Sequence, residues 1–374
     1  MSDPARDPAD DSTPYSPSAA SDTSSSCAVS RVSAVSPLSA VATHPLAKRI
    51  IAGERRALAQ GITLIESTRA DHKSQADILL TQLLPQTGGA VRIGVSGTPG
   101  VGKSTFIEVL GLFLVGLGKR VAVLAVDPSS VRTGGSILGD KTRMEGLACH
   151  PDAFIRPSPS GGTLGGVARR TRESLLLCEA AGFDVVIVET VGVGQSEVAV
   201  AGMSDIFLLM LAPAAGDELQ GMKRGVMELA DLVIVNKADG DFRRHAERSA
   251  GEYRAALHLM RPKSPHWSAR VLLVSALEER GIEEVWAVVQ EHRAALGSSG
   301  EREAQRVLQA KDWMWREVVD AVETVLRTDV EVAPEVAQVE WLVLNGELLP
   351  TRAAQHILQT FCSLSGKIAG RIPE

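Results

Sequence analysis

Aromatic residues and cysteines are scarce in this 374-residue chain, and long apolar runs are missing. Phe, Trp and Tyr together make up 4% of the residues. The four cysteines are scattered without a C-x-x-C pair, which excludes a disulfide framework and a thiolate zinc site and favours a reducing, cytoplasmic setting. They are Cys27, Cys149, Cys178 and Cys362. No run approaches the roughly 18 to 20 apolar residues that span a bilayer, so no membrane association is expected.

Positive charge is also in short supply. The chain has 39 Lys and Arg against 45 Asp and Glu, a formal net charge of −6. This balance argues against a protein that binds nucleic acid or a membrane surface through bulk positive charge. Glycine, by contrast, is plentiful, with 34 residues that are unevenly spread.

Four segments with different patterns divide the chain. Residues 1–45 are rich in Ser, Pro and Asp and are predicted to be disordered; their acids argue against a signal peptide or an organelle presequence. Residues 46–88 have apolar positions at helical spacing, which predicts two or three helices. Residues 89–296 form the predicted main domain, and residues 297–374, beginning with the GSSG linker, form a predicted helical arm.

Short apolar, β-branched runs recur through the main domain, each separated from the next by enough chain for a helix. Unalternated apolar strands between helical connections predict an α/β fold with a mostly parallel, doubly wound sheet that is covered on both faces. Functional loops are then expected at the carboxyl ends of the strands. The six runs are Val91–Val95, Val121–Val126, Val185–Val188, Ile206–Leu211, Leu232–Val235 and Val271–Val274.

The first of these runs leads directly into Gly97–Ser104, GTPGVGKS, which has the G-x-x-x-x-G-K-S pattern of a phosphate-binding loop and precedes an apolar helix. Small residues let the backbone wrap a phosphate with its N–H groups facing the anion. Lys103 is predicted to reach the β- and γ-phosphates of a nucleotide, and the Ser104 hydroxyl is predicted to bind Mg²⁺.

Two later loops indicate that the base is guanine. The run Leu232–Val235 ends at Asn236-Lys237-Ala238-Asp239, an N-K-x-D pattern. Asp239 is predicted to accept hydrogen bonds from guanine N1–H and the exocyclic amine, which adenine does not present. Asn236 is predicted to hold the loop, and the stem of Lys237 is predicted to lie on the base. In the Ser275–Leu277 loop a backbone N–H is predicted to meet guanine O6.

Two further strand ends carry carboxylates that suit a hydrated Mg²⁺ ion. Asp127 precedes Pro128, so a simple turn is the alternative for it, and Glu189 precedes the segment TVG. Asp140, in the loop GGSILGDKTR, is a further candidate for the metal. Gln195 does not directly follow Gly192, where a typical GTPase places the Gln that orients water; this predicts slow intrinsic hydrolysis that a partner accelerates.

Several features keep more than one interpretation. Arg169, Arg170 and Arg172 fit a solvated helix face better than a phosphate contact. The helical tail carries Trp313, Trp315 and Trp341, which must be buried against the same chain or against another subunit. No pair of histidines has the spacing of metal ligands.

Taken in order and spacing, these blocks resemble the MeaB group of GTPases, to which the methylmalonic aciduria type A protein belongs. The resemblance covers about residues 46–366 and rests on GVSGTPGVGKSTFIE, VDPSS, GGSILGDKTRM, ETVGVGQSE, PAAGDELQGMKRG, NKAD and VSAL. It implies a homodimeric GTPase that uses GTP and Mg²⁺ and acts as a chaperone of an adenosylcobalamin-dependent acyl-CoA mutase, typically methylmalonyl-CoA mutase. An adenosyltransferase that supplies the cofactor is a second implied partner.

The resemblance also implies roles for individual residues. Phosphates are expected on Gly97, Thr98, Pro99, Gly100, Val101, Gly102, Lys103, Ser104 and Thr105. Magnesium is expected on Ser104, Asp127, Asp140 and Glu189, and hydrolysis is expected to use Lys103, Asp127, Asp140 and Glu189. Guanine is expected on Asn236, Lys237, Asp239, Ser275, Ala276 and Leu277. The loop from Pro213 to Arg224 resembles a third switch that contacts the mutase, and the tail resembles a dimerisation arm.

Two other functions stay open. Some members of the group carry an older label as kinases of an amino-acid transport system, in which the γ-phosphate would pass to an acceptor. A metallochaperone GTPase is the other alternative, although the chain lacks a His- or Cys-rich segment.

Overall fold

The computed structural model describes residues 44–126, 144–157, 164–190, 196–213 and 224–368. Contacts divide the chain into Met1–Ala42 and Thr43–Glu374, and every described residue lies in the second unit. Of the tail predicted to be disordered, residues 1–43 lie outside the described residues, whereas His44 caps the first helix and Pro45 begins it. The subdivision of the second unit at residues 88 and 296 stays a prediction.

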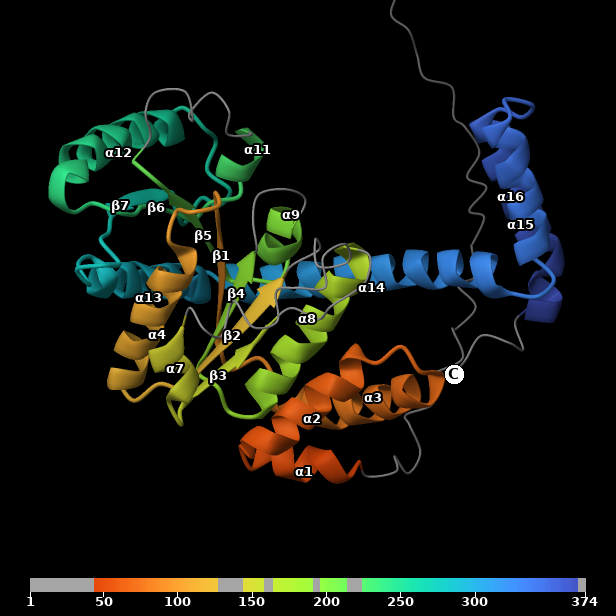
Figure 1. The fold of residues 1–374 in the computed structure, drawn as a ribbon, viewed down its shortest axis with the longest axis horizontal. Helices are drawn as coiled ribbons and strands as arrows, with labels where there is room; N and C mark the ends of the chain where they lie inside the picture. Colours follow the sequence, from red (N-terminus) through yellow and green to blue (C-terminus); the bar gives the residue numbers. More distant parts are fainter. Residues whose placement is uncertain (1–43, 127–143, 158–163, 191–195, 214–223, 369–374) are drawn as a thin grey trace, which may run out of the picture. The chain divides into compact units, whose positions relative to one another are not determined.

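The described residues contain a seven-stranded parallel sheet, which confirms the predicted α/β class (Figure 1). Its order is β3-β2-β4-β1-β5-β6-β7. The six predicted runs all form strands, and the seventh, β3, was missed because four residues at a sheet edge carry almost no pattern. The strands are β1 Val91–Gly97, β2 Val121–Val126, β3 Ala153–Arg156, β4 Val185–Thr190, β5 Ile206–Leu211, β6 Leu232–Val235 and β7 Arg270–Leu273.

Helices cover both faces of the sheet, as its wholly apolar strands require. One face packs on α4 (Lys103–Gly116), α7 (Glu145–Cys149) and α13 (Ile282–Ser298). The other packs on α8 (Leu164–Ala180) and α9 (Ser196–Ala201), with α12 (Arg243–His258) over its β6 and β7 end. Alternate residues of β5 show the division, since Leu208 belongs to the first face and Phe207 to the second.

The predicted helices before the main domain are α1 (Pro45–Ile51), α2 (Arg55–Glu66) and α3 (Ala70–Leu83), followed by a 3₁₀ turn, η1 (Leu84–Gln86). Their apolar side chains share one core with α8 and the second face of the sheet; Ile50, Leu58 and Leu79 are fully buried there. The three helices therefore form an additional layer over α8.

Three helices follow α13, as predicted for the tail: α14 (Glu301–Thr328), α15 (Ala333–Leu344) and α16 (Pro350–Ile368). The GSSG linker is shorter than predicted, since α13 includes Gly297 and Ser298 and α14 begins right after Gly300. No residue of α14 is buried, although it has one apolar face. Trp315 and Trp341 are 56% and 57% exposed, so the described part of the chain does not cover them.

Polar contacts attach α14 to the GTPase core. Arg306 forms an ion pair with the buried Asp205, at 2.7 Å from both carboxylate oxygens, and donates to the carbonyls of Gly88 and Ala90 at 2.7 and 2.8 Å. Gln309 donates to the Ser204 carbonyl at 2.8 Å. The base of α14 thus contacts the segments that lead into β1 and β5.

The arginines of α8 correct one sequence interpretation. Arg172 is buried rather than solvated: it donates to the Gly202 carbonyl at 3.1 Å, and its guanidinium lies 6.0 Å from the ring centre of Trp313 on α14. Burial and the nearby Arg316 lower the pKa of Arg172 to about 10. Arg169 forms ion pairs with Glu173 and with Glu317 of α14. The packing of α14 against α8, which helical periodicity does not reveal, explains the difference.

No helix among the described residues is long and apolar enough to cross a membrane.

Candidate GTP-binding site

Glycines shape the loop between β1 and α4 because side chains would collide there. A Cβ on Gly97 would come 2.3 Å from the carbonyl oxygen of Met210 on β5. Gly102 has φ +92°, and its Cβ would come 2.7 Å from Nδ2 of Asn236. Gly100 also has a positive φ, of +77°. Only glycine adopts such backbone without strain, so the loop lies tight against the neighbouring strand ends.

Lys103 is the first residue of α4 and is only 8% exposed. Its Nζ donates to the carbonyl oxygens of Gly97 at 2.8 Å and Thr98 at 3.3 Å, so the side chain folds back over the loop. Burial lowers the pKa of Lys103, and the charges of Glu189 and Glu197 act against that shift. Among the described residues its hydrogen bonds go to carbonyls alone, and a poorly hydrated ammonium held in this way is well placed to move to a phosphate.

Ser104 and Glu189 bring oxygen atoms together beside this loop. The Ser104 hydroxyl donates to Oε1 of Glu189 over a long 3.5 Å, and the carboxylate is 5% exposed. Glu189 pairs in register with Val95 of β1 and Ala125 of β2, at the carboxyl ends of three adjacent strands. A hydroxyl and a carboxylate are donors that Mg²⁺ accepts, with water and phosphate oxygens completing its shell.

Asn236 links the phosphate loop to the second predicted base-binding loop. Its side chain is buried, with Nδ2 donating to the Val101 carbonyl at 2.9 Å and Oδ1 accepting from the Ala276 N–H at 3.1 Å. One amide therefore spans segments that are 135 and 40 residues away in the sequence. This geometry fits the predicted role of Asn236 in holding the loops.

The other predicted guanine-binding residues lie together at the ends of β6 and β7. The Ser275 hydroxyl donates to Oδ2 of Asp239, and it accepts from the Glu278 N–H at 3.1 Å. These bonds orient the carboxylate, which is half-buried. Lys237 is exposed and has φ +60°, a strained conformation for a lysine. Leu277 is 81% exposed, so this part of the site faces solvent.

Other predicted site residues lie outside the described part of the chain. They are Asp127, Asp140 and the whole loop Gly134–Arg143, the segment 191–195 with Gly192 and Gln195, and nearly all of Pro213–Arg224. Among the residues that are described, no group of three His, Cys, Asp or Glu side chains could hold a metal ion. Two of the four metal-binding residues predicted from the sequence are therefore seen.

The structure adds residues that the sequence did not single out. Glu197, in the first turn of α9, is 1% exposed and acts electrostatically on Lys103. Thr190 donates to the Ser96 hydroxyl at 2.9 Å and so ties the ends of β4 and β1 together. Glu197 is the last residue of the ETVGVGQSE block, so its position in the sequence already indicated a residue near the site. Its burial distinguishes it from an ordinary solvated acid in the first turn of a helix.

Comparison with known proteins identifies the family. Residues 58–331 match the family model described as methylmalonyl Co-A mutase-associated GTPase MeaB. The chain belongs to the MeaB family. It is a GTPase and binds guanine nucleotide.

Individual relatives agree with this assignment. A protein of Caulobacter vibrioides named as a GTPase is 56% identical over 316 residues, covering 84% of this chain and 97% of the relative. The mitochondrial methylmalonic aciduria type A homolog of Mus musculus is 46% identical over 327 residues, covering 84% and 78%. The solved structure of a LAO/AO transport system kinase is 40% identical, with a TM-score of 0.68, and the match covers 84% of this chain and 96% of that one.

Proposed function

We propose that this MeaB-family GTPase is a chaperone that gates adenosylcobalamin loading and protects or reactivates methylmalonyl-CoA mutase or a related acyl-CoA mutase. The name of the family model and that of the mouse relative support the mutase connection. The observation that carries the nucleotide part is the bridge that Asn236 forms between the phosphate loop and the Ser275–Leu277 loop.

In this proposal the loop Gly97–Thr105 holds the phosphates, and Lys103 exchanges its carbonyl partners for phosphate oxygens. Ser104 and Glu189 would hold Mg²⁺ together with Asp127 and Asp140. The ion would neutralise charge on the phosphates and help to position the attacking water. Asp239, oriented by Ser275, would read the guanine edge.

The proposed assembly is a homodimer built on the helical arm. The apolar face of α14 is left open, with Val319 62% exposed and Trp315 56% exposed, and Trp341 of α15 is equally open. Exposed apolar surface of this kind is typical of an interface with another subunit. A cobalamin adenosyltransferase is a further proposed partner, and a cytoplasmic setting is proposed from the cysteine content.

The decisive experiment measures binding of this protein to purified methylmalonyl-CoA mutase with GDP and with a non-hydrolysable GTP analogue. We expect the mutase affinity to differ between the two nucleotide states. In Lys103→Ala the difference should vanish while the dimer persists, because Lys103 contacts the loop and no dimer surface. If no acyl-CoA mutase of this class binds in either state, the chaperone proposal is wrong even though the GTPase activity stands.

A second candidate is a kinase of an amino-acid transport system, since the similar solved structure is named as a LAO/AO transport system kinase. The two functions differ in where the γ-phosphate goes. With γ-labelled GTP, the chaperone proposal expects all the label as free phosphate, and label on a purified amino-acid-binding protein would favour the kinase.

A further inference from the structure

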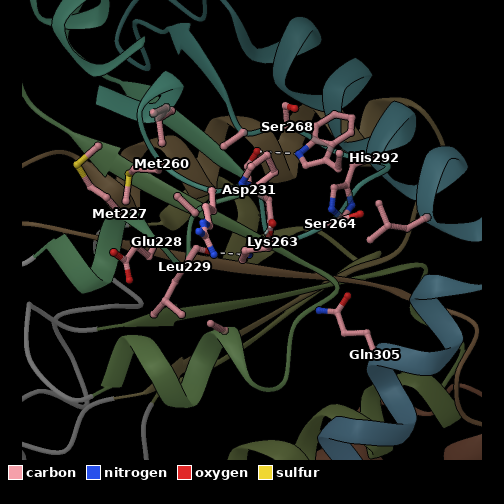
Figure 2. A pocket seen from close by; sticks show the side chains of 18 of the residues that line it. Met227, Glu228, Leu229, Asp231, Met260, Lys263, Ser264, Ser268, His292 and Gln305 are labelled. Atoms are coloured by element: carbon pink, nitrogen blue, oxygen red, sulfur yellow. Dashed lines mark hydrogen bonds and ion pairs between the residues drawn. The ribbon is translucent and has the colours of Figure 1, made fainter. Parts of the chain in front are cut away.

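A groove of about 1130 Å³ lies at the amino-terminal edge of the sheet, away from the nucleotide loops. Asp231, directly before β6, and Arg270, at the start of β7, mark that edge. One wall is the face of α14 from Glu301 to Arg316, and the opposite wall comes from the segments before β6 and β7 (Figure 2). The end of α9 contributes Ala201 and Gly202.

The groove exposes apolar side chains. Leu308 of α14 and Val198 of α9 are 59% and 55% exposed, and both line it. Met260 adds a half-buried side chain to the lining, whereas Met227 and Leu296, at 7% and 4% exposed, add little apolar surface. Exposed apolar side chains in an open groove are typical of a site that a partner covers.

Three of the four acids that line the groove already have partners. Asp231 accepts from the Phe207 N–H at 2.8 Å and forms an ion pair with Lys263 at 2.6 Å. Glu301 accepts from the Ser264 hydroxyl at 2.7 Å and contacts His266 at 3.0 Å. Glu228, the third of these acids, also has a polar or electrostatic partner. Asp231, Glu301 and Glu228 thus already have partners within the chain.

Several arginines of the groove are not neutralised in this way. Within the described part of the chain, neither Arg261 nor Arg316 forms an ion pair, and Arg254 makes one long bond of 3.5 Å to the Val271 carbonyl. Asp312, the other acid on this face of α14, acts electrostatically on Arg172 of α8. Unpaired guanidiniums beside apolar surface favour an occupant with carboxylates next to apolar side chains.

We propose that this groove binds an acidic segment of a partner protein that carries apolar side chains on one face. The stretch of α14 from Glu301 to Arg316 is about 22 Å long at about 1.5 Å per residue, which matches a helical segment of about four turns. Helices bind such grooves through apolar side chains at i, i+3, i+4 and i+7. The site is distinct from the nucleotide loops and does not depend on the proposed mutase function.

Contact with α9 gives the occupant a route to the nucleotide site. The helix begins at Ser196, immediately after segment 191–195, in which the γ-phosphate contact is predicted. Its last residue, Ala201, lines the groove. A segment bound in the groove therefore touches the element that continues from the predicted switch.

The test uses fluorescence anisotropy of a labelled helical peptide of about 16 residues, with Leu on one face and Glu elsewhere. A twin peptide has Lys in place of every Glu. We expect the Glu peptide to bind the full-length protein, the Lys peptide not to bind, and added salt to weaken the binding. Leu308→Asp and Arg261→Glu should each weaken it by about tenfold or more, because one removes an apolar contact and the other reverses a charge.

Matched controls separate this effect from a general change of surface. Leu117→Asp, at the 52% exposed end of α4, and Arg244→Glu, at an exposed arginine of α12, lie outside the groove and should leave binding unchanged. Circular dichroism confirms folding of each variant. Equal binding of the two peptides, or no effect of Leu308→Asp, would overturn the proposal. So would self-association that Leu308→Asp abolishes without any peptide binding, since the occupant would then be a second copy.

Discussion

Replacing Asn236 by Ala removes one amide that satisfies two buried backbone groups. The Val101 carbonyl loses its donor at 2.9 Å and the Ala276 N–H loses its acceptor at 3.1 Å, and both residues are at most 5% exposed. An unsatisfied buried polar group costs about 1–3 kcal/mol, so the two together cost about 2–6 kcal/mol. A water molecule in the space left by the amide would offset part of this cost, and we expect about 2–4 kcal/mol.

The cost should appear in nucleotide binding as well as in stability. Without the amide, the phosphate loop and the Ser275–Leu277 loop are no longer held together, and GDP has to order them when it binds. At about 1.4 kcal/mol per tenfold change, a cost of about 1.4–2.8 kcal/mol weakens GDP binding by about 10- to 100-fold. Titration with a fluorescent GDP analogue and denaturant unfolding without nucleotide measure the two effects separately.

The chain offers a matched control in its other asparagine. Asn345 donates to the Trp341 carbonyl at 3.1 Å at the exposed end of α15, so Asn345→Ala should change GDP affinity by less than about twofold. If Asn236→Ala lowers stability by less than about 1 kcal/mol and leaves GDP affinity unchanged, the two loops are held by other contacts and the reasoning is refuted.

Three other substitutions test separate parts of the structure. Asp239→Asn should switch the binding preference from GTP to XTP in a competition assay, because the amide of Asn donates to the C2 carbonyl of xanthine. An unchanged preference would mean that Asp239 does not contact the base. Arg306→Ala leaves the carboxylate of Asp205 buried without its ion pair and should cost about 3–5 kcal/mol in denaturant unfolding; recovery of about half the loss in Arg306→Lys is the control, and a loss below about 1 kcal/mol would contradict the role of this pair. Burial raises the pKa of Glu173 to about 6 from 4.5, so the folded protein keeps a proton that the unfolded chain has released. Relative to Glu173→Gln, the wild type should therefore lose roughly 2 kcal/mol of stability in total as the pH rises from well below the lower pKa to well above the higher one, and parallel pH profiles of the two proteins would show that Glu173 titrates normally.

Local patterns in the sequence were enough for the fold class and the chemistry of the loops. Six of the seven strands are predicted by short apolar runs, because a strand buried on both faces has no polar side. The phosphate loop and the N-K-x-D loop are each one short stretch of sequence, so the spacing of residues within each motif already predicts which residue types face a nucleotide. The edge strand Ala153–Arg156 escaped detection because its pairing with β2 depends on a neighbour about 30 residues earlier in the chain.

Contacts between distant segments depended on the tertiary structure. The sequence predicts that Asn236 holds a loop, but only the sheet order β1-β5-β6-β7 and the packing of the loops after these strands show that its partners are Val101 and Ala276. The sequence predicts that Arg172 lies on a solvated helix face, but α14, which begins more than 120 residues later in the chain, covers it. The groove along α14 likewise cannot be predicted from any single segment, because its walls come from parts of the chain that are distant in sequence. Side-chain types and their period follow from the local chain, whereas burial and hydrogen-bond partners depend on which surfaces the whole chain brings together.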